Sequence, residues 1–235
     1  MRLEIQWIDV EPGRVFIGSD NRSVLFGGIG PRHEVKIDYN FEISYLPVNY
    51  EIANVALQGE GCYVASESEW ALAVQKKLIS GKNEVEELSD RIRSSYWSKY
   101  CDGRPFIEND WLMKVSRSWN SGKPSISSIR KDEKCEYLRL VKRPKTNHND
   151  SSSPKLPSSP DKSKLLFEEL LISIVIGVIP SFVWAYFNAS TGYISEGWLN
   201  LVFGGLFIGV FTAIFWRPRT KSWRVGNNCG KMKII

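Results

Sequence analysis

The chain has 235 residues, of which 43% are hydrophobic and 24% are charged, and its formal net charge is +5. These values allow one or two domains with a sizeable core, and they exclude collagen, a disulfide scaffold and a wholly disordered chain. The charge is distributed unevenly, because 165–216 contains no Lys, Arg or Asp and only three Glu. A cation-free stretch of this length in a basic chain indicates surroundings other than water.

The first part of the chain, 1–142, is predicted to be a folded α+β domain. Short apolar runs separated by Gly and Pro predict strands near its start. Residues 33–38 alternate in polarity, with Val35 and Ile37 on one face, and 41–45 continue this pattern.

Two helices and a final strand come after these strands. Residues 50–57 are compatible with a helix, and 66–78 favour one more strongly. Ser66 can cap that second helix, and Glu69 stands three residues later, which is the spacing of a capping box. Residues 137–141 predict a short strand at the end of the domain.

Residues 143–164 are rich in Ser, Pro, Lys and Asn, and Leu156 is their only large apolar side chain. Such a segment buries too little surface to fold by itself. We therefore expect a disordered linker that tethers the domain to the C-terminal part of the chain.

Two apolar runs come next, Leu170–Phe187 with 18 residues and Trp198–Trp216 with 19. A helix that crosses a bilayer needs about 20 apolar residues. We therefore predict two transmembrane helices, over 165–187 and 198–216. The alternative is a pair of buried helices in a globular core, although core helices usually keep a polar face.

Basic residues flank both helices, whereas the predicted loop between them, 188–197, contains none. Cytoplasmic flanks carry the excess of Lys and Arg. We therefore expect an integral membrane protein with two spans, whose N- and C-termini are cytoplasmic. The tail, 217–235, carries six cations and no anion. Candidate contacts to lipid headgroups are Arg217, Arg219, Lys221 and Arg224.

Two features inside the spans bear on packing. Pro180 is expected to kink the first helix. Gly204, Gly205 and Gly209 allow close helix approach in the second, where Gly205 and Gly209 have small-xxx-small spacing. This pattern is equally compatible with a merely glycine-rich membrane helix. A homo- or hetero-oligomer formed through the hairpin is therefore one possibility.

Six blocks occur in a fixed order within the first domain. They are Val10–Ser19, Pro31–Ile37, Phe41–Asn49, Tyr63–Trp70, Val115–Asn120 and Leu138–Lys142. The ordered set resembles the formylglycine-generating enzyme (sulfatase-modifying factor) family. The first block is similar to that family's IPGGxFxMGS motif, and the fourth to its RLPTEAEW block, without the arginine and proline. The resemblance implies a C-type-lectin-like fold for the domain.

The chain departs from this family at the positions of its copper-binding and calcium-binding residues. Catalytic members hold copper with a cysteine pair just after the block matched by Val115–Asn120, but 120–130 contains no Cys. The block that helps to bind calcium is not recognisable, and Glu108–Trp111 is at best a remnant of it. The resemblance therefore argues against oxidase activity, and we predict no catalytic residue, metal ligand or cofactor.

The remaining chemistry-bearing residues are sparse. The four cysteines are far apart in sequence, and a cytoplasmic location keeps them reduced. His148 lies in the predicted linker, and the resemblance makes His33 structural. No P-loop, G-x-G-x-x-G or H-E-x-x-H motif is present.

One segment combines aromatic and basic side chains, and it is compatible either with a ligand-facing surface or with loop packing. Together with two residues of a later block, its candidate ligand-binding residues are Tyr96, Trp97, Tyr100, Arg104, Trp111, Arg117 and Trp119. Such segments also occur in proteins that bind nucleic acid. However, 1–141 carries 19 cations against 21 anions, and this mildly acidic balance argues against that partner.

The sequence supports three functional hypotheses. The first is a membrane-anchored, non-catalytic module that binds a protein or a small molecule. The second is a degenerate metal-dependent oxidase that uses Cys101 or Cys135. The third is an accessory subunit whose hairpin assembles with another membrane protein.

Overall fold

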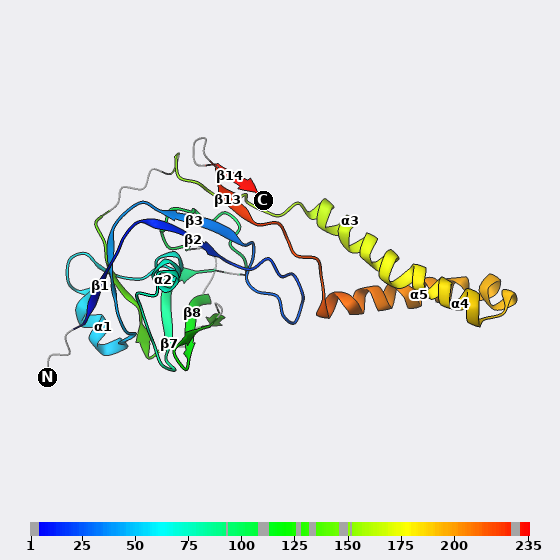
Figure 1. Cartoon of the computed structure of the whole chain (residues 1–235), viewed down its shortest axis with the longest axis horizontal. Coiled ribbons are helices and arrows are strands. Elements are labelled where there is room, and N and C mark those ends of the chain that lie inside the picture. Colours follow the sequence, from blue (N-terminus) through cyan, green and yellow to red (C-terminus); the bar gives the residue numbers. More distant parts are fainter. Residues whose placement is uncertain are drawn as a thin grey trace. The chain divides into compact units, whose positions relative to one another are not determined.

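The computed structural model describes residues 5–92, 94–107, 113–125, 128–131, 135–145, 150, 152–226 and 231–235. It is a mixed α+β structure that divides into two compact units (Figure 1). We call the first the sheet unit, which comprises 1–20, 28–157 and 220–235. The second, comprising 21–27 and 158–219, is the hairpin unit.

The sheet unit contains three small sheets. The first has the strand order β1-β4-β12-β6, and the second has the order β10-β8-β7-β11-β5, with β9 paired to β8. The third has the order β14-β13-β3-β2. Most neighbouring strands are antiparallel, but β11 pairs with β7, and β13 with β3, in parallel. Each sheet thus contains at least one pair of neighbours from distant parts of the chain, β4 with β12, β5 with β11 and β3 with β13, and these pairs join the two ends of the unit.

The bounds of the strands in the first half of the unit are β1 Trp7–Val10, β2 Gly13–Ile17, β3 His33–Ile37, β4 Phe41–Ser44, β5 Val48–Asn49, β6 Cys62–Val64 and β7 Val85–Arg91. Those in the second half are β8 Met113–Asn120, β9 Lys123–Pro124, β10 Ser128–Lys131, β11 Tyr137–Leu138, β12 Leu140–Lys142, β13 Trp223–Val225 and β14 Met232–Ile234. The predicted strands over 33–38 and 41–45 are confirmed as β3 and β4. The predicted strand over 137–141 is split at Arg139, whose side chain is buried.

Two helices belong to this unit, α1 Tyr50–Leu57 and α2 Glu67–Gln75. Both were expected from the sequence. The capping box is confirmed: the Ser66 hydroxyl accepts from the Glu69 N–H, and the Glu69 carboxylate accepts from the Ser66 N–H. This reciprocal pair satisfies two backbone donors that a helix start otherwise leaves without partners.

The predicted disordered linker differs from the structure in its second half. Leu156 is only 2% exposed and belongs to the main hydrophobic core. The Cys101 N–H donates to the Pro154 carbonyl at 2.7 Å, and the Leu156 N–H donates to the Lys99 carbonyl at 3.0 Å. A single apolar anchor and extended backbone pairing hold this segment, and average composition does not reveal either.

Part of the basic tail is folded into the sheet unit. The Trp223 N–H donates to the Arg32 carbonyl at 3.0 Å, and the Val225 N–H donates to the Glu34 carboxylate at 3.1 Å. Trp223 and Val225 pack against the core. The tail therefore completes the third sheet, because alternating apolar side chains cover the core while the cations between them face outward.

The hairpin unit contains two long helices. The first, Lys162–Asn188, is continuous through α3 Lys162–Ile172, the π-helical segment η1 Ser173–Val178 and α4 Ile179–Asn188. The second is α5 Thr191–Phe215. Both are long and apolar enough to cross a membrane.

The predicted connection over 188–197 is corrected to a much shorter turn. Ser190 caps α5, because its hydroxyl accepts from the Tyr193 N–H at 3.2 Å. The second helix therefore begins at Thr191 rather than at the first residue of the apolar run, Trp198. A helix is extended by its cap and backbone hydrogen bonds, whereas the sequence prediction followed hydropathy alone.

Candidate functional site

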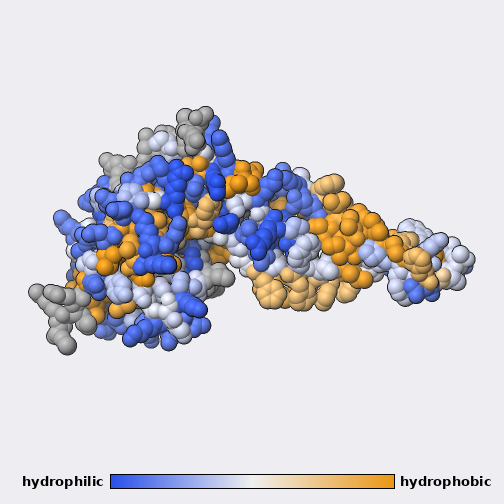
Figure 2. All heavy atoms as spheres, in the orientation of Figure 1, coloured by the Kyte–Doolittle hydropathy of each residue, from blue (hydrophilic) through white to orange (hydrophobic). Residues whose placement is uncertain are grey.

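The hairpin unit presents its apolar side chains outward. In the most apolar window of each helix, only 11% and 17% of the residues are buried. Exposed side chains include Trp184, Phe203 and Phe207. Figure 2 shows hydrophobic atoms gathered over these helices. This pattern differs from that of a core helix pair, which buries its large apolar residues and exposes polar ones.

The two helices contact each other through the backbone of glycine residues. Gly177 faces Gly205, so that a Cβ on either residue would overlap the opposite backbone. A Cβ on Gly209 would lie 2.6 Å from the Cα of Ser173. Helices approach this closely only where small residues line the contact. The predicted close approach at Gly205 and Gly209 is thus present within the hairpin, whereas Gly204 faces open space.

The π-helical segment explains how Pro180 is accommodated. Proline has no N–H, so it leaves a carbonyl of the preceding turn without its usual donor. Here the six residues Ser173–Val178 adopt the wider π form directly before the proline. The Ser181 hydroxyl donates to the Gly177 carbonyl at 2.9 Å. Gly177, which contacts α5, lies in this π-helical segment. The irregular helix before Pro180 is therefore part of the contact between the two helices.

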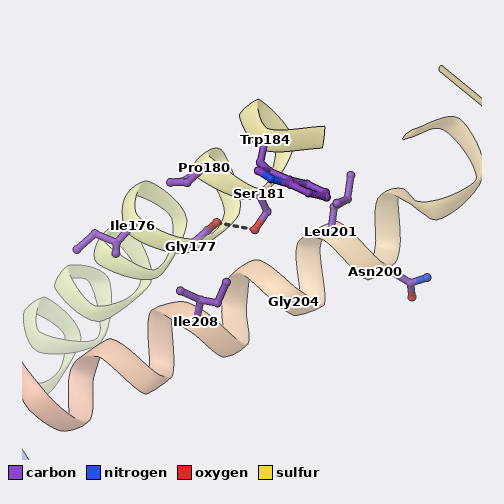
Figure 3. Close-up of a pocket in the computed structure, with 9 residues that line it drawn as sticks. All are labelled: Ile176, Gly177, Pro180, Ser181, Trp184, Asn200, Leu201, Gly204 and Ile208. Carbon is purple, nitrogen blue, oxygen red and sulfur yellow. Dashed lines mark hydrogen bonds between the residues drawn. The ribbon is translucent and has the colours of Figure 1, made fainter. Parts of the chain in front are cut away.

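A groove of about 330 Å³ lies beside this contact (Figure 3). Pro180, Trp184 and Ile176 line one side, while Gly204 and Ile208 of α5 line the other. In Figure 3 the ring of Trp184 lies over Leu201. Asn200 also lines the groove, but in Figure 3 its side chain points away from Trp184 and Leu201.

Charged side chains gather at the end of the hairpin unit where the chain enters and leaves it. Arg22 reaches Glu168 at 3.1 Å and Glu169 at 3.5 Å, and Arg217 reaches Glu169 at 3.4 Å. Arg22 was not predicted as a site residue. The adjacent carboxylates at the start of an apolar helix were the available signal, but their partner lies 146 residues earlier.

The four predicted headgroup contacts fall in different places. Arg217 pairs with Glu169 in the hairpin unit, and Arg224 lies on β13 with its guanidinium over the ring of Phe16. Arg219 and Lys221 are exposed. Their contact with lipid stays a prediction.

Three of the seven predicted ligand-binding residues are buried in the sheet unit. Tyr96 is fully buried and donates to Glu67, which also accepts from Arg117 at 2.6 Å. Trp119 is buried, and its indole N–H donates to Glu86 at 2.7 Å. These three side chains therefore form part of the core hydrogen-bond network.

The other members of this set lie nearer the surface. Trp97 packs edge-on against Trp223, with ring centroids 6.2 Å apart. Arg104 stacks over Tyr100 at 4.2 Å and binds Asp102. Burial opposes ionisation of Asp102, but its hydrogen bonds from Arg104 and Ser153 outweigh burial and hold its pKa below the ordinary value. Trp111 lies outside the described residues.

A buried charge cluster lies beneath these residues. The Lys99 ammonium is 2.7 Å from Asp90, and both side chains are fully buried. Burial lowers the pKa of Lys99, but the adjacent carboxylates outweigh this effect and raise it. His33 is also fully buried, and desolvation lowers its pKa to about 3. The histidine is therefore neutral, and its Nδ1–H donates to the Pro31 carbonyl at 2.8 Å.

Three cysteines of the sheet unit, Cys62, Cys101 and Cys135, are buried. Burial raises the pKa of the Cys101 thiol to about 12, so the nucleophilic thiolate form is scarce at neutral pH. Within the described ranges, no cluster of three or more His, Cys, Asp or Glu side chains is placed to hold a metal ion.

No family model, curated protein or solved structure matches the chain. The site must therefore be interpreted from its own geometry, and the C-type-lectin-like resemblance stays a prediction.

Proposed function

We propose that the chain is an integral membrane protein in which the hairpin unit crosses the bilayer twice and anchors the sheet unit. The observation that carries this proposal is the outward-facing apolar surface of two long helices that meet through glycine backbone. Exposing such a surface to water is unfavourable, whereas a bilayer accepts it. Outward apolar residues also argue against the alternative of two core helices.

The fold of the tail supports this topology. Residues 152–157 precede the hairpin and 220–225 come after it, and both belong to the sheet unit. Because one folded unit cannot lie on both sides of a membrane, the two ends of the hairpin must lie on the same side. An even number of spans satisfies this requirement. The excess of Lys and Arg on both flanks favours the cytoplasmic side.

The sheet unit is proposed to act as a non-catalytic binding module for a protein or small molecule on that face. Its buried carboxylates are engaged in ion pairs or in hydrogen bonds from Trp, Tyr and backbone groups, which favours a structural role for them. The degenerate-oxidase alternative is weakened by the raised pKa of Cys101. Relation to the formylglycine-generating enzyme family remains part of the proposal and rests on the ordered sequence blocks.

Membrane extraction of the full chain tests the anchor. We expect the protein to remain with membranes after alkaline carbonate treatment and to leave only with detergent. Phe207→Arg places a charge on the outward face of α5 and is expected to reduce insertion, because arginine at a helix centre costs about 2.5–3.5 kcal/mol on translocon scales. Val55→Arg in α1 is the matched control. Release of the unaltered chain by carbonate would contradict the proposal.

A second candidate, an accessory subunit that assembles through its hairpin, is favoured by the groove. Gly204 lines this groove and has open space where a Cβ would lie. Small residues promote helix association in lipid. If a partner co-purifies in mild detergent, its loss on Gly204→Leu indicates assembly through the groove. Its retention indicates binding by the sheet unit.

A further inference from the structure

The loop between β2 and β3 carries an exposed apolar tip. Val24 is 63% exposed, Leu25 is 58% exposed and Phe26 is 68% exposed. Three adjacent large apolar side chains on a loop form a patch that water does not favour. By contact this loop, residues 21–27, belongs to the hairpin unit although its sequence lies within the sheet region.

The loop is held in a defined turn by its own polar groups. The Asn21 carboxamide accepts from the Ser23 N–H at 3.0 Å and donates to the Phe26 carbonyl at 3.0 Å. The Ser23 hydroxyl accepts from the Phe26 N–H at 3.1 Å, and the Ser23 carbonyl accepts from the Gly27 N–H at 2.9 Å. The amides of Ser23, Phe26 and Gly27 and the carbonyls of Ser23 and Phe26 are thus hydrogen-bonded within the turn, while the apolar side chains at its tip are exposed. Each such bond lowers the cost of placing the turn in a nonaqueous environment.

The loop also contacts the end of the second long helix. The Leu25 N–H donates to the Ile214 carbonyl at 3.3 Å, which supplies a donor to one of the last carbonyls of α5. Ile214 lies inside the second apolar run, two residues before Trp216. Leu25 is therefore at the level where the apolar surface of the helix ends.

Arg22 fixes the other side of the same loop. Its guanidinium binds Glu168 and Glu169 of α3, so the loop contacts both helices of the hairpin. Arg217 adds a further cation at Glu169. Charges beside an apolar tip match the boundary between headgroups and acyl chains, where cations face the polar layer.

We propose that Val24, Leu25 and Phe26 insert into the lipid leaflet beside the hairpin and form a third point of membrane attachment. This inference rests on the proposed membrane anchor. A lipid surface is favoured over a protein partner for two reasons. The tip continues the apolar surface of α5, and the Leu25 backbone amide is already used by that helix.

Spin labels on the full chain in phosphatidylcholine–phosphatidylglycerol vesicles test the proposal. Single cysteines are introduced as Phe26→Cys, Val24→Cys, Phe203→Cys and Val55→Cys, after Cys229 has been replaced by Ser. The other three cysteines are buried. Oxygen partitions into lipid and a nickel chelate stays in water, so the ratio of collision rates reports depth. Phe203 is the control in the hairpin and Val55 the control in the sheet unit.

We expect the labels at positions 26 and 24 to give an oxygen-to-nickel ratio severalfold higher than that at position 55, approaching the ratio at 203. A lipid signal at 203 with aqueous signals at both loop positions would overturn the loop proposal alone. Protection of both loop labels from oxygen and nickel together would indicate a protein contact and would also overturn it. An aqueous signal at 203 would overturn the membrane anchor itself.

Discussion

The two units of this protein bury opposite kinds of residue. The sheet unit encloses ionised side chains together with its apolar core, among them Arg139, Lys99 and Glu86, each fully buried. The hairpin unit encloses glycine backbone and exposes large apolar side chains. Buried charges persist only when every one is paired, and exposed apolar surface persists only when water is not the solvent. The contrast supports the proposal that the two units meet different solvents.

The largest expected effect comes from breaking the central charge pair of the sheet unit. Arg139 donates to Glu86 through Nε at 2.5 Å and also to the carbonyls of Ser44, Tyr45 and Ser80. Arg139→Met leaves the Glu86 carboxylate buried without its cation. We expect the free energy of unfolding to fall by about 3–5 kcal/mol, as for other broken buried pairs. Denaturant unfolding of the full chain in nanodiscs, followed by tryptophan fluorescence, measures this loss.

Lys142→Met provides the control for that prediction. Lys142 pairs with Glu42 at 3.1 Å, but both side chains are more than 40% exposed. Its loss is expected to cost at most about 1 kcal/mol, because surface pairs contribute little. If both substitutions lowered the free energy of unfolding by the same amount, the expected difference between buried and surface ion pairs would be contradicted.

The matching experiment in the hairpin replaces one glycine at the helix contact. A side chain at Gly205 would meet the backbone of Val178 at 2.6 Å, whereas one at Gly204 meets nothing within 4 Å. We expect Gly205→Leu to destabilise the helix pair by about 3 kcal/mol, the upper part of the range for overpacking, because backbone must move. Gly204→Leu is expected to leave the hairpin of the single chain intact. Steric trapping in bicelles compares the two, and equal losses would contradict the assigned contact face.

A smaller effect is expected where the tail joins the sheet unit. Trp223→Ala removes a partly buried ring that packs on Trp97 and the core. The loss is expected to be about 2 kcal/mol, roughly half that of a fully buried tryptophan. Hydrogen exchange at the β13 amides should increase as the tail detaches. Arg224→Ala, at an exposed position on the same strand, should leave the exchange rates nearly unchanged. Rapid exchange of β13 in the unaltered chain would show that the tail is not part of the unit.

A pH dependence is expected from His33. Its pKa is lowered from 6.5 to about 3 on folding, because burial disfavours the charged ring. The unfolded chain therefore binds the extra proton below pH 6.5, and stability decreases as pH falls towards 3. The expected slope is at most about 1.4 kcal/mol per pH unit.

Unfolding between pH 6.5 and 5 measures this slope while most carboxylates remain ionised. His33→Gln should flatten it, and His148→Gln, the other histidine, should not. An unchanged slope in His33→Gln would contradict the assignment to this residue.

Local features were predicted well from the sequence. The capping box at Ser66 was predicted because a cap depends on residues three positions apart. The long helices were predicted because their hydropathy is continuous over many residues. Strands β3 and β4 were predicted from alternation within five residues.

Features that depend on distant contacts were missed. Strand β13 at Trp223 forms by pairing with β3, which lies nearly 200 residues earlier in the chain. Leu156 is buried in a hydrophobic core whose other residues come from distant parts of the chain. The aromatic residues Tyr96 and Trp119 looked suited to bind a ligand, because sequence does not reveal that Glu67 and Glu86 are their buried partners. The groove likewise depends on which face of α5 is covered by η1.

The central claim is that the hairpin crosses a membrane and returns to a single folded unit on one side. Cysteine labelling with a membrane-impermeant maleimide in sealed, oriented vesicles tests it most directly. Single cysteines are placed at Val55 in α1, Gly192 in the first turn of α5 and Lys233 in β14, with Cys229 replaced by Ser. The account predicts that positions 55 and 233 are labelled from the same side and position 192 only from the opposite side. Labelling of 55 and 233 from opposite sides, or of all three from one side, would contradict it.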